Sequence, residues 1–366
     1  MAQVQVRNRE GAAVTLINIR ATVGHSEDGF TDDRFTDLAG NTAFGHTMPP
    51  SAEGYTLRVN VANVNPKYRA RTIHISDFHD DVHITLPRER LRRLHMYRQI
   101  FVDDIGQRVF ILGHTDFLLY KRFLDGEYIE SLLAERARYG SNCARIIGMV
   151  NSFAHWYPQE YGQRYYDAIP AFFDLLDRYG MYGYFTVFAD TEIVMPRKAD
   201  QLAHFDKVVA QLKACPNSLG ELVNEPYAHQ NATADPMAFT RPEGVPFSSG
   251  SYNDELGGDV TPPPHWDFHD FHVPRKDVKR VADQCMSTHP NYRTLGQGVF
   301  SGESDKFGGP NVFNPKVYLT DPEVARQMAR TAEGTACGYI YHTSGGVWSL
   351  PWNDAEKACA EATFSS

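Results

Sequence analysis

Hydrophobic and polar residues alternate with a period of two in several short runs near the start of the chain. The runs read VQV, VTLINIRATV, YTLRVNV, TIHIS and VHITL, and clusters of Gly, Pro, Asp and Asn separate them. Alternation of this kind predicts strands that bury one face and expose the other. Residues 1–88 are therefore predicted to form an all-β domain.

The pattern changes after a basic segment, RERLRRLHMY at 88–97, which is expected to be a linker or the first helix of a second domain. Beyond it, strand-like runs such as CARIIGMV alternate with stretches of helical periodicity such as YYDAIPAFFDLLDRYG. The steps of about 30 to 40 residues have the size of a β–α unit. Residues 89–366 are thus predicted to form an α/β domain, a (β/α)8 or TIM barrel. Seven strands can be placed, and the fifth of the eight should lie within 227–264.

Composition narrows the possible partners. The chain is 42% hydrophobic and 22% charged, as in ordinary globular proteins. Its net charge of -9 repels phosphate backbones and anionic bilayers, so neither a nucleic-acid nor a membrane partner is expected. The opening MAQVQVRNREG lacks the pattern of a signal peptide. The location therefore stays open among the cytoplasm, a virion and secretion after removal of a signal, and the oligomeric state is open too.

Two glutamates stand where a barrel enzyme carries its reactive groups, at the C-terminal ends of strands. Glu225 follows the fourth strand in GELVNEPYAH, and Glu303 follows the seventh in GVFSGESDKFG. Strands four and seven lie across the barrel mouth from each other. Glycoside hydrolysis needs two carboxyl groups flanking the scissile bond, one protonated and one ionised. Glu225 and Glu303 are the candidate pair, with solvated surface glutamates as the alternative.

Five segments of the chain resemble the cellulase-like family 5 of clan A glycoside hydrolases. They read FVDDIGQRVFILGHTDFLLYKRFLDG, ARIIGM, LVNEP, GVFSGESDKFG and GGVWS, and they span residues 99 to about 350. The resemblance implies a small hairpin that closes the barrel floor, and it places Arg145 at the site. It also implies that Asn224 and Glu225 are the strand-four pair, with Glu225 as acid/base. Glu303 would be the nucleophile, and Trp348 would form the floor of the sugar subsite.

The chain departs from the family's pattern at two strands. Ser304 follows Glu303 where the family usually has glycine or an aromatic residue, which makes Asp305 the fallback nucleophile. On the sixth strand the resemblance carries over His272, but valine and proline follow it. The family's tyrosine that contacts the nucleophile therefore has no counterpart there. Tyr341 or His342, on the last strand, is the candidate for that place.

Other residues near predicted strand ends are candidates for sugar binding. Trp156 lies just past the second strand, and sugar rings pack their C–H faces on aromatic planes. Asp116 follows the first strand, while Asp190 and Glu192 follow the third, and carboxylates there can accept hydrogen bonds from sugar hydroxyls. The alternatives are ordinary core aromatics and loop carboxylates.

The segment FTDLAGNTAFGHTMPPSAEGYTLRV, in the N-terminal domain, resembles carboxypeptidase regulatory-like, transthyretin-like β-sandwiches. This resemblance implies that residues 1–88 form a β-sandwich that serves as a spacer or attachment module. A polar stretch in the same domain, HISDFHDDVH at 74–83, reads as a hairpin loop, with a calcium or zinc site as the alternative.

Two other function classes stay open. A metal-dependent hydrolase would centre on His265, His269 and His272, whose spacing places three imidazoles on one face of a helix. The segment HWDFHDFHVP reads better as a strand, on which positions 269 and 272 lie on opposite faces. The other class is a barrel that binds carbohydrate without cleaving it, because Ser304 and the sixth strand depart from the family's pattern.

The sequence as a whole predicts a retaining glycosidase that acts on a polysaccharide or oligosaccharide. Glu303 would attack the anomeric carbon while Glu225 protonates the leaving oxygen, which requires carboxyl groups about 5 to 5.5 Å apart. Asn224 would bind the 2-hydroxyl, and Arg145 would help to keep Glu303 charged. Neither a metal nor an organic cofactor is expected, and the kind of sugar is left open.

Overall fold

The computed structural model of the chain divides into two compact units, residues Met1–Arg90 and Leu91–Ser366. The structure describes residues 3–8, 18–23, 31–35, 41–43, 55–60, 71–75, 82–86, 90–98, 100–226, 231–253, 265–272, 298–301, 322–335 and 337–364.

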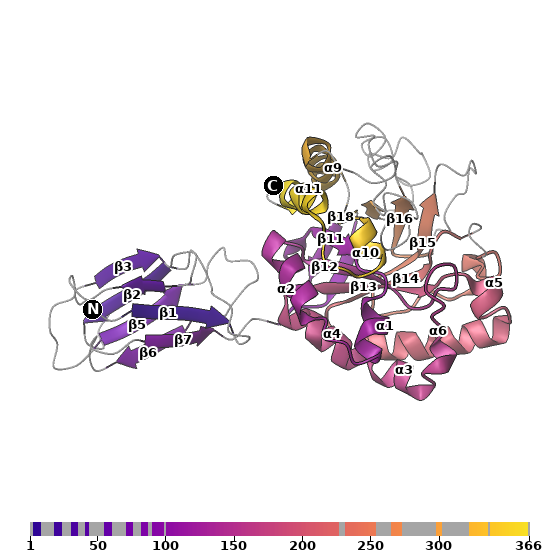
Figure 1. Cartoon of the computed structure of the whole chain (residues 1–366), viewed down its shortest axis with the longest axis horizontal. Helices are drawn as coiled ribbons and strands as arrows, with labels where there is room; N and C mark the ends of the chain where they lie inside the picture. Colours follow the sequence, from indigo (N-terminus) through magenta and orange to yellow (C-terminus); the bar gives the residue numbers. More distant parts are fainter. Residues whose placement is uncertain are drawn as a thin grey trace. The chain divides into compact units, whose positions relative to one another are not determined.

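The first unit consists of short strands, in indigo and purple in Figure 1. They are β1(Gln3–Asn8), β2(Asn18–Val23), β3(Thr31–Phe35), β4(Asn41–Ala43), β5(Tyr55–Asn60), β6(Arg71–Ile75) and β7(Val82–Leu86). They form two sheets, with strand orders β4-β1-β7 and β3-β2-β5-β6. Alternate residues are buried on both sheets, for example Val4 and Val6 on β1 and Leu57 and Val59 on β5. The alternating runs therefore form strands with one buried face, whereas the β-sandwich stays a prediction.

The second unit is built around a closed barrel of eight strands in chain order. They are β11(Ile111–Thr115), β12(Cys143–Ile147), β13(Tyr182–Phe188), β14(Ser218–Val223), β15(Phe247–Asn253), β16(Phe268–His272), β17(Gly298–Ser301) and β18(Gly338–Tyr341). Each strand runs parallel to its neighbours, and β18 pairs back with β11. The predicted (β/α)8 barrel is confirmed, and its fifth strand lies within 227–264, as expected.

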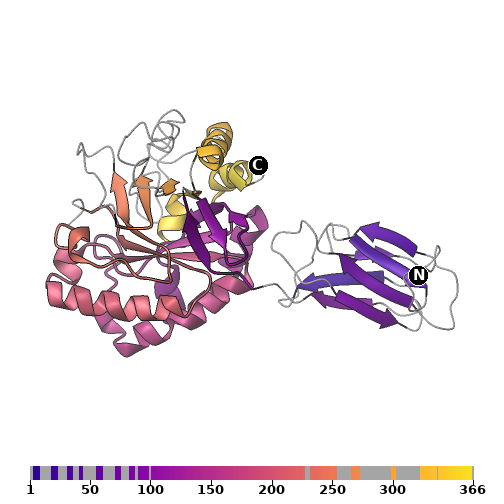
Figure 2. The ribbon, with the colours of Figure 1, turned by 180° about the vertical axis from the view of Figure 1, so that it is seen from behind.

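In the described parts of the chain, helices follow most of the strands and lie on the outside of the barrel. They are α1(Leu119–Leu124), α2(Glu130–Tyr139), α3(Gln163–Asp167), α4(Ile169–Arg178), α5(Thr191–Val194), α6(Lys198–Lys213), α9(Pro322–Thr335), α10(Ser344–Val347) and α11(Asp354–Phe364), with 3-10 turns η1(Pro158–Glu160) and η2(Pro236–Ala238). Figure 2 shows the long α6, in pink, lying across the outer side. Helix α4 buries Phe172, Phe173 and Leu176, an apolar stripe at helical spacing that packs against the barrel.

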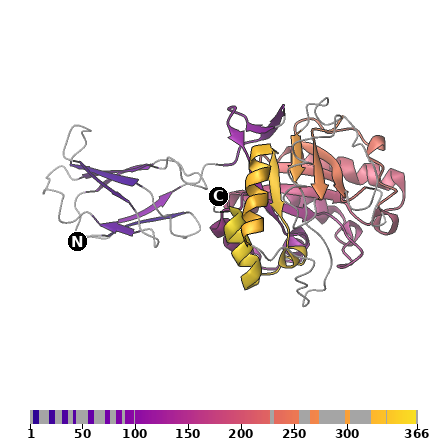
Figure 3. The ribbon, with the colours of Figure 1, turned by 90° about the horizontal axis from the view of Figure 1, so that it is seen from above.

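A small antiparallel sheet, in purple in Figure 3, packs against the floor of the barrel, where the barrel strands begin. It consists of β8(Leu94–Tyr97), β9(Ile100–Asp103) and β10(Arg108–Val109). Leu94 and Phe101 are fully buried and pack in one cluster with Ile111 and Cys143, two of the first residues of barrel strands. The prediction of a linker or helix at 88–97 is wrong for Leu94–Tyr97. Its basic residues suggested a helix, but pairing with β9 and burial of Leu94 stabilise a strand.

Candidate active site

A layer of polar side chains lies directly above the apolar floor of the barrel. Cys143, Leu219 and Phe268 belong to the floor cluster. Residues two positions further along a strand share the same face, and this places Arg145, Glu221 and Asp270 in the next layer. All three are fully buried. The barrel interior therefore changes from apolar to charged within one layer of side chains.

Arg145 on β12 and Glu221 on β14 form a buried ion pair in this layer. Arg145 Nε donates to Glu221 Oε2 at 3.0 Å, and Nη2 donates to Oε1 at 3.1 Å and to Oε2 at 2.8 Å. The hydroxyl of Thr186 on β13 donates to the same Oε2. Charge-assisted bonds of this kind fix the plane of the guanidinium group. Glu221 is not among the site residues predicted from the sequence, although a glutamate amid the buried residues of a strand is itself a signal of a paired interior charge.

Tyr184 and Asp270 complete the layer on the other side of Arg145. The Tyr184 hydroxyl donates to Asp270 Oδ2 at 3.3 Å and lies 2.9 Å from the Ser248 hydroxyl. Arg145 Nε lies 3.8 Å from Asp270 Oδ2. Burial, and then the charges of Glu221 and Asp270, raise the pKa of Tyr184 well above its usual value. Tyr184 therefore stays a hydrogen-bond donor throughout the neutral range.

Asn224 and Glu225 follow directly after β14, at the C-terminal end of the fourth strand. Arg145 Nη2 donates to Asn224 Oδ1 at 2.9 Å, so the ion pair below determines which side of the amide faces the guanidinium. The backbone N–H of Asn224 donates to the Phe188 carbonyl at 2.9 Å, which ties the ends of β13 and β14 together. The ion pair and the backbone thus hold Asn224 from two directions.

Glu225 has an unusual backbone conformation. Its φ is 48°, in the left-handed region, and its side chain is 5% exposed. A non-glycine residue there costs roughly 1–3 kcal/mol and persists only where its surroundings enforce it, most often at functional sites. The neighbouring strand adapts to this turn, because a Cβ atom on Gly250 of β15 would lie 2.5 Å from the Val223 carbonyl oxygen. The chain therefore builds a strained, mostly buried carboxyl group at this strand end.

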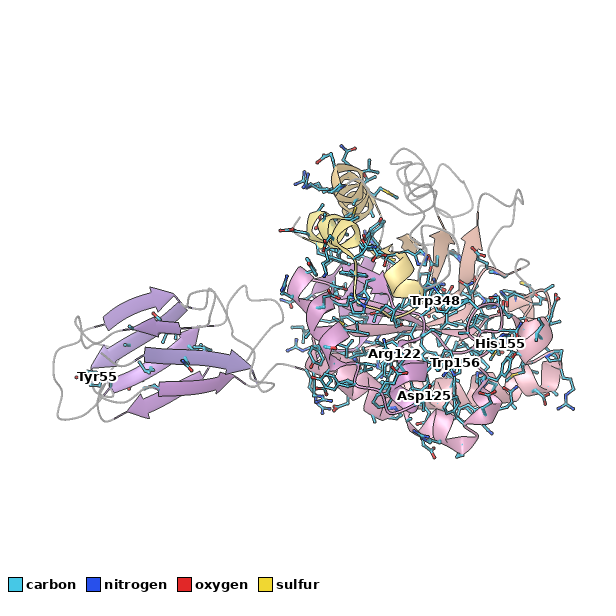
Figure 4. The ribbon with its side chains drawn as sticks, viewed as in Figure 1. Tyr55, Arg122, Asp125, His155, Trp156 and Trp348 are labelled. Atoms are coloured by element: carbon cyan, nitrogen blue, oxygen red, sulfur yellow. The ribbon has the colours of Figure 1, made fainter. Side chains whose placement is uncertain are left out.

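Two residues in the C-terminal part of the chain, His342 and Trp348, lie over the ends of β11 and β12. His342 is buried, and its Nδ1 lies 3.0 Å from the Thr115 hydroxyl. Trp348 is half-buried and meets Phe153 edge to face, with 5.4 Å between ring centroids (Figure 4). The loop that carries Trp348 is held by Arg122 of α1, which donates to the Ser349 carbonyl.

Tyr341 lies on the other side of β18 from His342. Its hydroxyl donates to the Glu356 carbonyl on α11 at 2.9 Å, and its ring packs edge to face against Trp352 and Phe364. Because adjacent residues of a strand point to opposite faces, Tyr341 faces the C-terminal helix. Of the two residues considered as the family's missing tyrosine, the structure brings only His342 to the inner face.

Asp116 is turned away from the barrel mouth as well. It is fully buried beside Arg136 of α2, with Arg136 Nη2 3.2 Å from its Oδ1, and His114 Nε2 lies 3.1 Å from its Oδ2. Burial alone would raise the pKa of Asp116, but the charge of Arg136 and the contact with His114 outweigh it, and the pKa is lowered. The carboxylate is thus ionised and already bound by protein groups.

Trp156 is a core residue in this structure. It is fully buried, its backbone pairs with Val150, and its ring lies 6.2 Å from that of Tyr120, centroid to centroid (Figure 4). Asp190 is buried too, and it accepts hydrogen bonds from the backbone N–H of Asn151 and Ser152 at 2.8 and 2.6 Å. Both side chains shape the loop after β12 from within.

The remaining candidates lie at the edge of what the structure describes. Strand β17 ends at Ser301, and Glu303 and Asp305 lie outside the described residues. His272 ends β16, with its side chain outside them as well. The segment around it forms the expected strand. Within the described ranges, no three His, Cys, Asp or Glu side chains are grouped so that they could hold a metal ion.

None of the helices in the described parts of the chain is both long and apolar enough to cross a bilayer.

Several solved glycoside hydrolases have a similar fold. A glycoside hydrolase family 5 structure from Bacteroides vulgatus ATCC 8482 gives a TM-score of 0.50 at 13% identity, covering 71% of this chain and 65% of that chain. A second glycoside hydrolase gives a TM-score of 0.53 at 14% identity, with 72% and 68% covered. The chain thus spans about two thirds of these structures. It matches no protein-family model and no curated protein, so the likeness is one of fold, a TIM barrel shared with family 5 enzymes.

Proposed function

We propose that this protein is a retaining glycoside hydrolase that acts on a polysaccharide or oligosaccharide. Glu225 serves as acid/base and Glu303 as nucleophile. The observation that carries the proposal is the Asn224–Glu225 turn. It lies at the end of the fourth barrel strand, with Glu225 mostly buried in a strained conformation and Asn224 bound by a buried arginine.

The surroundings of Glu225 suit a general acid. Glu225 is mostly buried at the C-terminal end of β14, and in the first step its carboxyl group gives a proton to the leaving oxygen. After the sugar has been transferred to Glu303, the same carboxylate removes a proton from the attacking water. Each catalytic residue thus changes its charge once in each half of the reaction.

Asn224 and Arg145 have separate roles in this proposal. The side-chain oxygen of Asn224 accepts a hydrogen bond from Arg145. The side-chain N–H groups of Asn224 are therefore directed to a sugar hydroxyl. A hydrogen bond to the 2-hydroxyl strengthens as positive charge develops on the ring. Arg145, held by Glu221, supplies a fixed positive charge that favours ionised Glu303.

Trp348, His342 and His272 would line the subsite at the bond to be broken. Trp348 offers the exposed part of its ring to a sugar face, backed by Phe153. The family 5 structure from Bacteroides vulgatus and this chain share the barrel, which supports the same placement of groups at strand ends. Residues 1–88 would act as a spacer or attachment domain.

The test is a comparison of leaving groups. The purified chain would be screened with α- and β-linked 2,4-dinitrophenyl and 4-methylumbelliferyl glycosides of glucose, mannose and galactose, and with their oligosaccharides. Glu225→Gln should lose about 10²–10⁴-fold on methylumbelliferyl glycosides and oligosaccharides, which need a proton. Formation of the glycosyl-enzyme from dinitrophenyl glycosides should hardly change, because dinitrophenolate leaves unaided.

Two control variants separate the roles of the carboxylates. Glu333 is exposed on α9, outside the barrel, so Glu333→Gln should leave every rate unchanged. Glu303→Gln should abolish turnover of all substrates, including the dinitrophenyl glycosides, whereas Asp305→Asn should not. Absence of hydrolysis by the parent protein across the panel would contradict the proposal. So would loss of activity on treatment with EDTA.

A further inference from the structure

Asn231 lies beside the Asn224–Glu225 turn and has no part in the site described above. It belongs to the loop after β14 and is 1% exposed. Its side-chain nitrogen donates to the backbone carbonyl of Asn224 at 2.6 Å, and its Oδ1 accepts from the backbone N–H of Thr191 at 3.3 Å. One amide group therefore connects the turn after β14 to the first residue of α5.

The bond to the Asn224 carbonyl acts on the peptide group that precedes Glu225. That carbonyl oxygen lies in the plane of the peptide linking Asn224 to Glu225. Holding it fixes the plane from which φ of Glu225 is measured, and this φ is 48°. Since the left-handed region is unfavourable for glutamate, a strong contact at this position favours the observed conformation over the extended one.

Asn231 is itself held by its neighbours. Its carbonyl accepts from the Ala234 N–H at 3.0 Å. The Thr233 hydroxyl donates to the Thr191 hydroxyl at 2.8 Å, and Gln201 of α6 donates to Thr233 at 3.1 Å. The contact to Asn224 therefore comes from a loop fixed to two helices, which suits the support of a precise geometry.

We propose that Asn231 is a positioning residue, which holds the peptide before Glu225 so that the carboxyl group reaches the leaving oxygen. This inference rests on the proposed function of Glu225. Displacement of a catalytic group by about 1 Å can cost on the order of 100-fold in rate. The effect should be confined to the step that needs the proton.

The test compares Asn231→Ala and Asn231→Asp with Asp235→Ala. Aspartate keeps the acceptor for Thr191 but cannot donate to Asn224. Asp235→Ala removes the acceptor of the Met237 N–H in the same loop and makes no contact with Asn224 or Asn231 that the structure describes. We expect both Asn231 variants to lose about 10- to 100-fold on methylumbelliferyl glycosides and under about threefold in forming the glycosyl-enzyme from dinitrophenyl glycosides. Asp235→Ala should stay within about threefold on both leaving groups. Equal losses on both leaving groups would overturn the inference.

Amide hydrogen exchange gives a readout that does not depend on turnover. The Asn224 N–H is bonded to the Phe188 carbonyl, and its exchange should be faster in both Asn231 variants and unchanged in Asp235→Ala. Unchanged exchange in the Asn231 variants would overturn the positioning role. If the parent protein hydrolyses none of the glycosides, the proposed function fails, and exchange alone then decides whether Asn231 holds the turn.

Discussion

Two buried arginine–carboxylate clusters lie on neighbouring strands of the barrel, and they face opposite ways. The interior cluster consists of Arg145, Glu221 and Asn224, inside the barrel. The outer cluster consists of His114, Asp116, Arg136 and Trp352, between β11 and α2. Both pairs of charges are fully removed from solvent. Their burial alone therefore does not distinguish a site from a structural contact.

The difference lies in what each arginine contacts besides its carboxylate. Arg145 donates to Asn224, the residue before Glu225. The guanidinium carbon of Arg136 lies 3.8 Å from the centroid of the Trp352 ring, and Nη2 donates to the Leu350 carbonyl at 2.8 Å. Arg136 thus holds the C-terminal segment against α2. The interior cluster thus determines the geometry of a strand end, whereas the outer cluster holds two layers of the fold together.

The largest effect is expected from Glu221→Gln. The substitution preserves shape but leaves Arg145 with only the more distant carboxylate of Asp270, 3.8 Å from its Nε. Breaking a buried pair typically costs about 3–5 kcal/mol. Since Arg145 also orients Asn224, activity per folded molecule should fall by about 10²-fold. Urea unfolding and kcat/KM on the preferred glycoside measure the two effects. Loss of stability with unchanged activity would make the interior cluster equivalent to the outer one.

A loss of stability alone is expected from Asp116→Asn. It removes the charge opposite Arg136, so the unfolding free energy should fall by about 3–5 kcal/mol. Activity measured well below the unfolding temperature should stay within about threefold, because Asp116 lies outside the barrel mouth. A loss of activity as large as that of Glu221→Gln would erase the distinction between the clusters.

A smaller, pH-dependent effect is expected from His114. Burial lowers its pKa below the usual 6.5, outweighing the contact with Asp116. The folded protein therefore binds fewer protons than the unfolded chain, and stability decreases below about pH 6.5 by up to ~1.4 kcal/mol per pH unit. His114→Asn should remove this contribution, as urea unfolding at pH 7 and pH 5 would show. Burial lowers the pKa of His204 to about 3, and this residue contributes the same dependence of stability on pH in the parent protein and in the variant. Equal slopes in the two proteins would contradict the assignment to His114.

Periodicity was sufficient to predict the barrel, because strand and helix patterns alternate over nearly the whole second unit. It also located Glu225, since a polar residue directly after an apolar run marks a strand end, whereas Asn224 was predicted from the resemblance to family 5. It could not decide which face a side chain occupies at a strand end. Tyr341 and Asp116 were expected at the site, yet both point outward, since a shift of one residue reverses the face.

Interior charges and supporting loops were harder to anticipate. A glutamate within an apolar strand indicates an interior charge, but only the closed barrel shows that the partner of Glu221 is Arg145 on a different strand. Asn231 follows a segment without periodicity, and its role depends on contacts with residues 7 and 40 positions away. Such contacts follow from the closed barrel and not from local sequence.

Chemical rescue of Glu225→Ala tests the central assignment most directly. This variant has no acid/base group, so the glycosyl-enzyme formed from a dinitrophenyl glycoside should accumulate and turn over slowly. Sodium azide, which needs no general base, should speed turnover and give a glycosyl azide with the configuration of the substrate. Azide should have no such effect on the parent protein. Failure of azide to raise the rate, or a glycosyl azide of inverted configuration, would contradict the role given to Glu225.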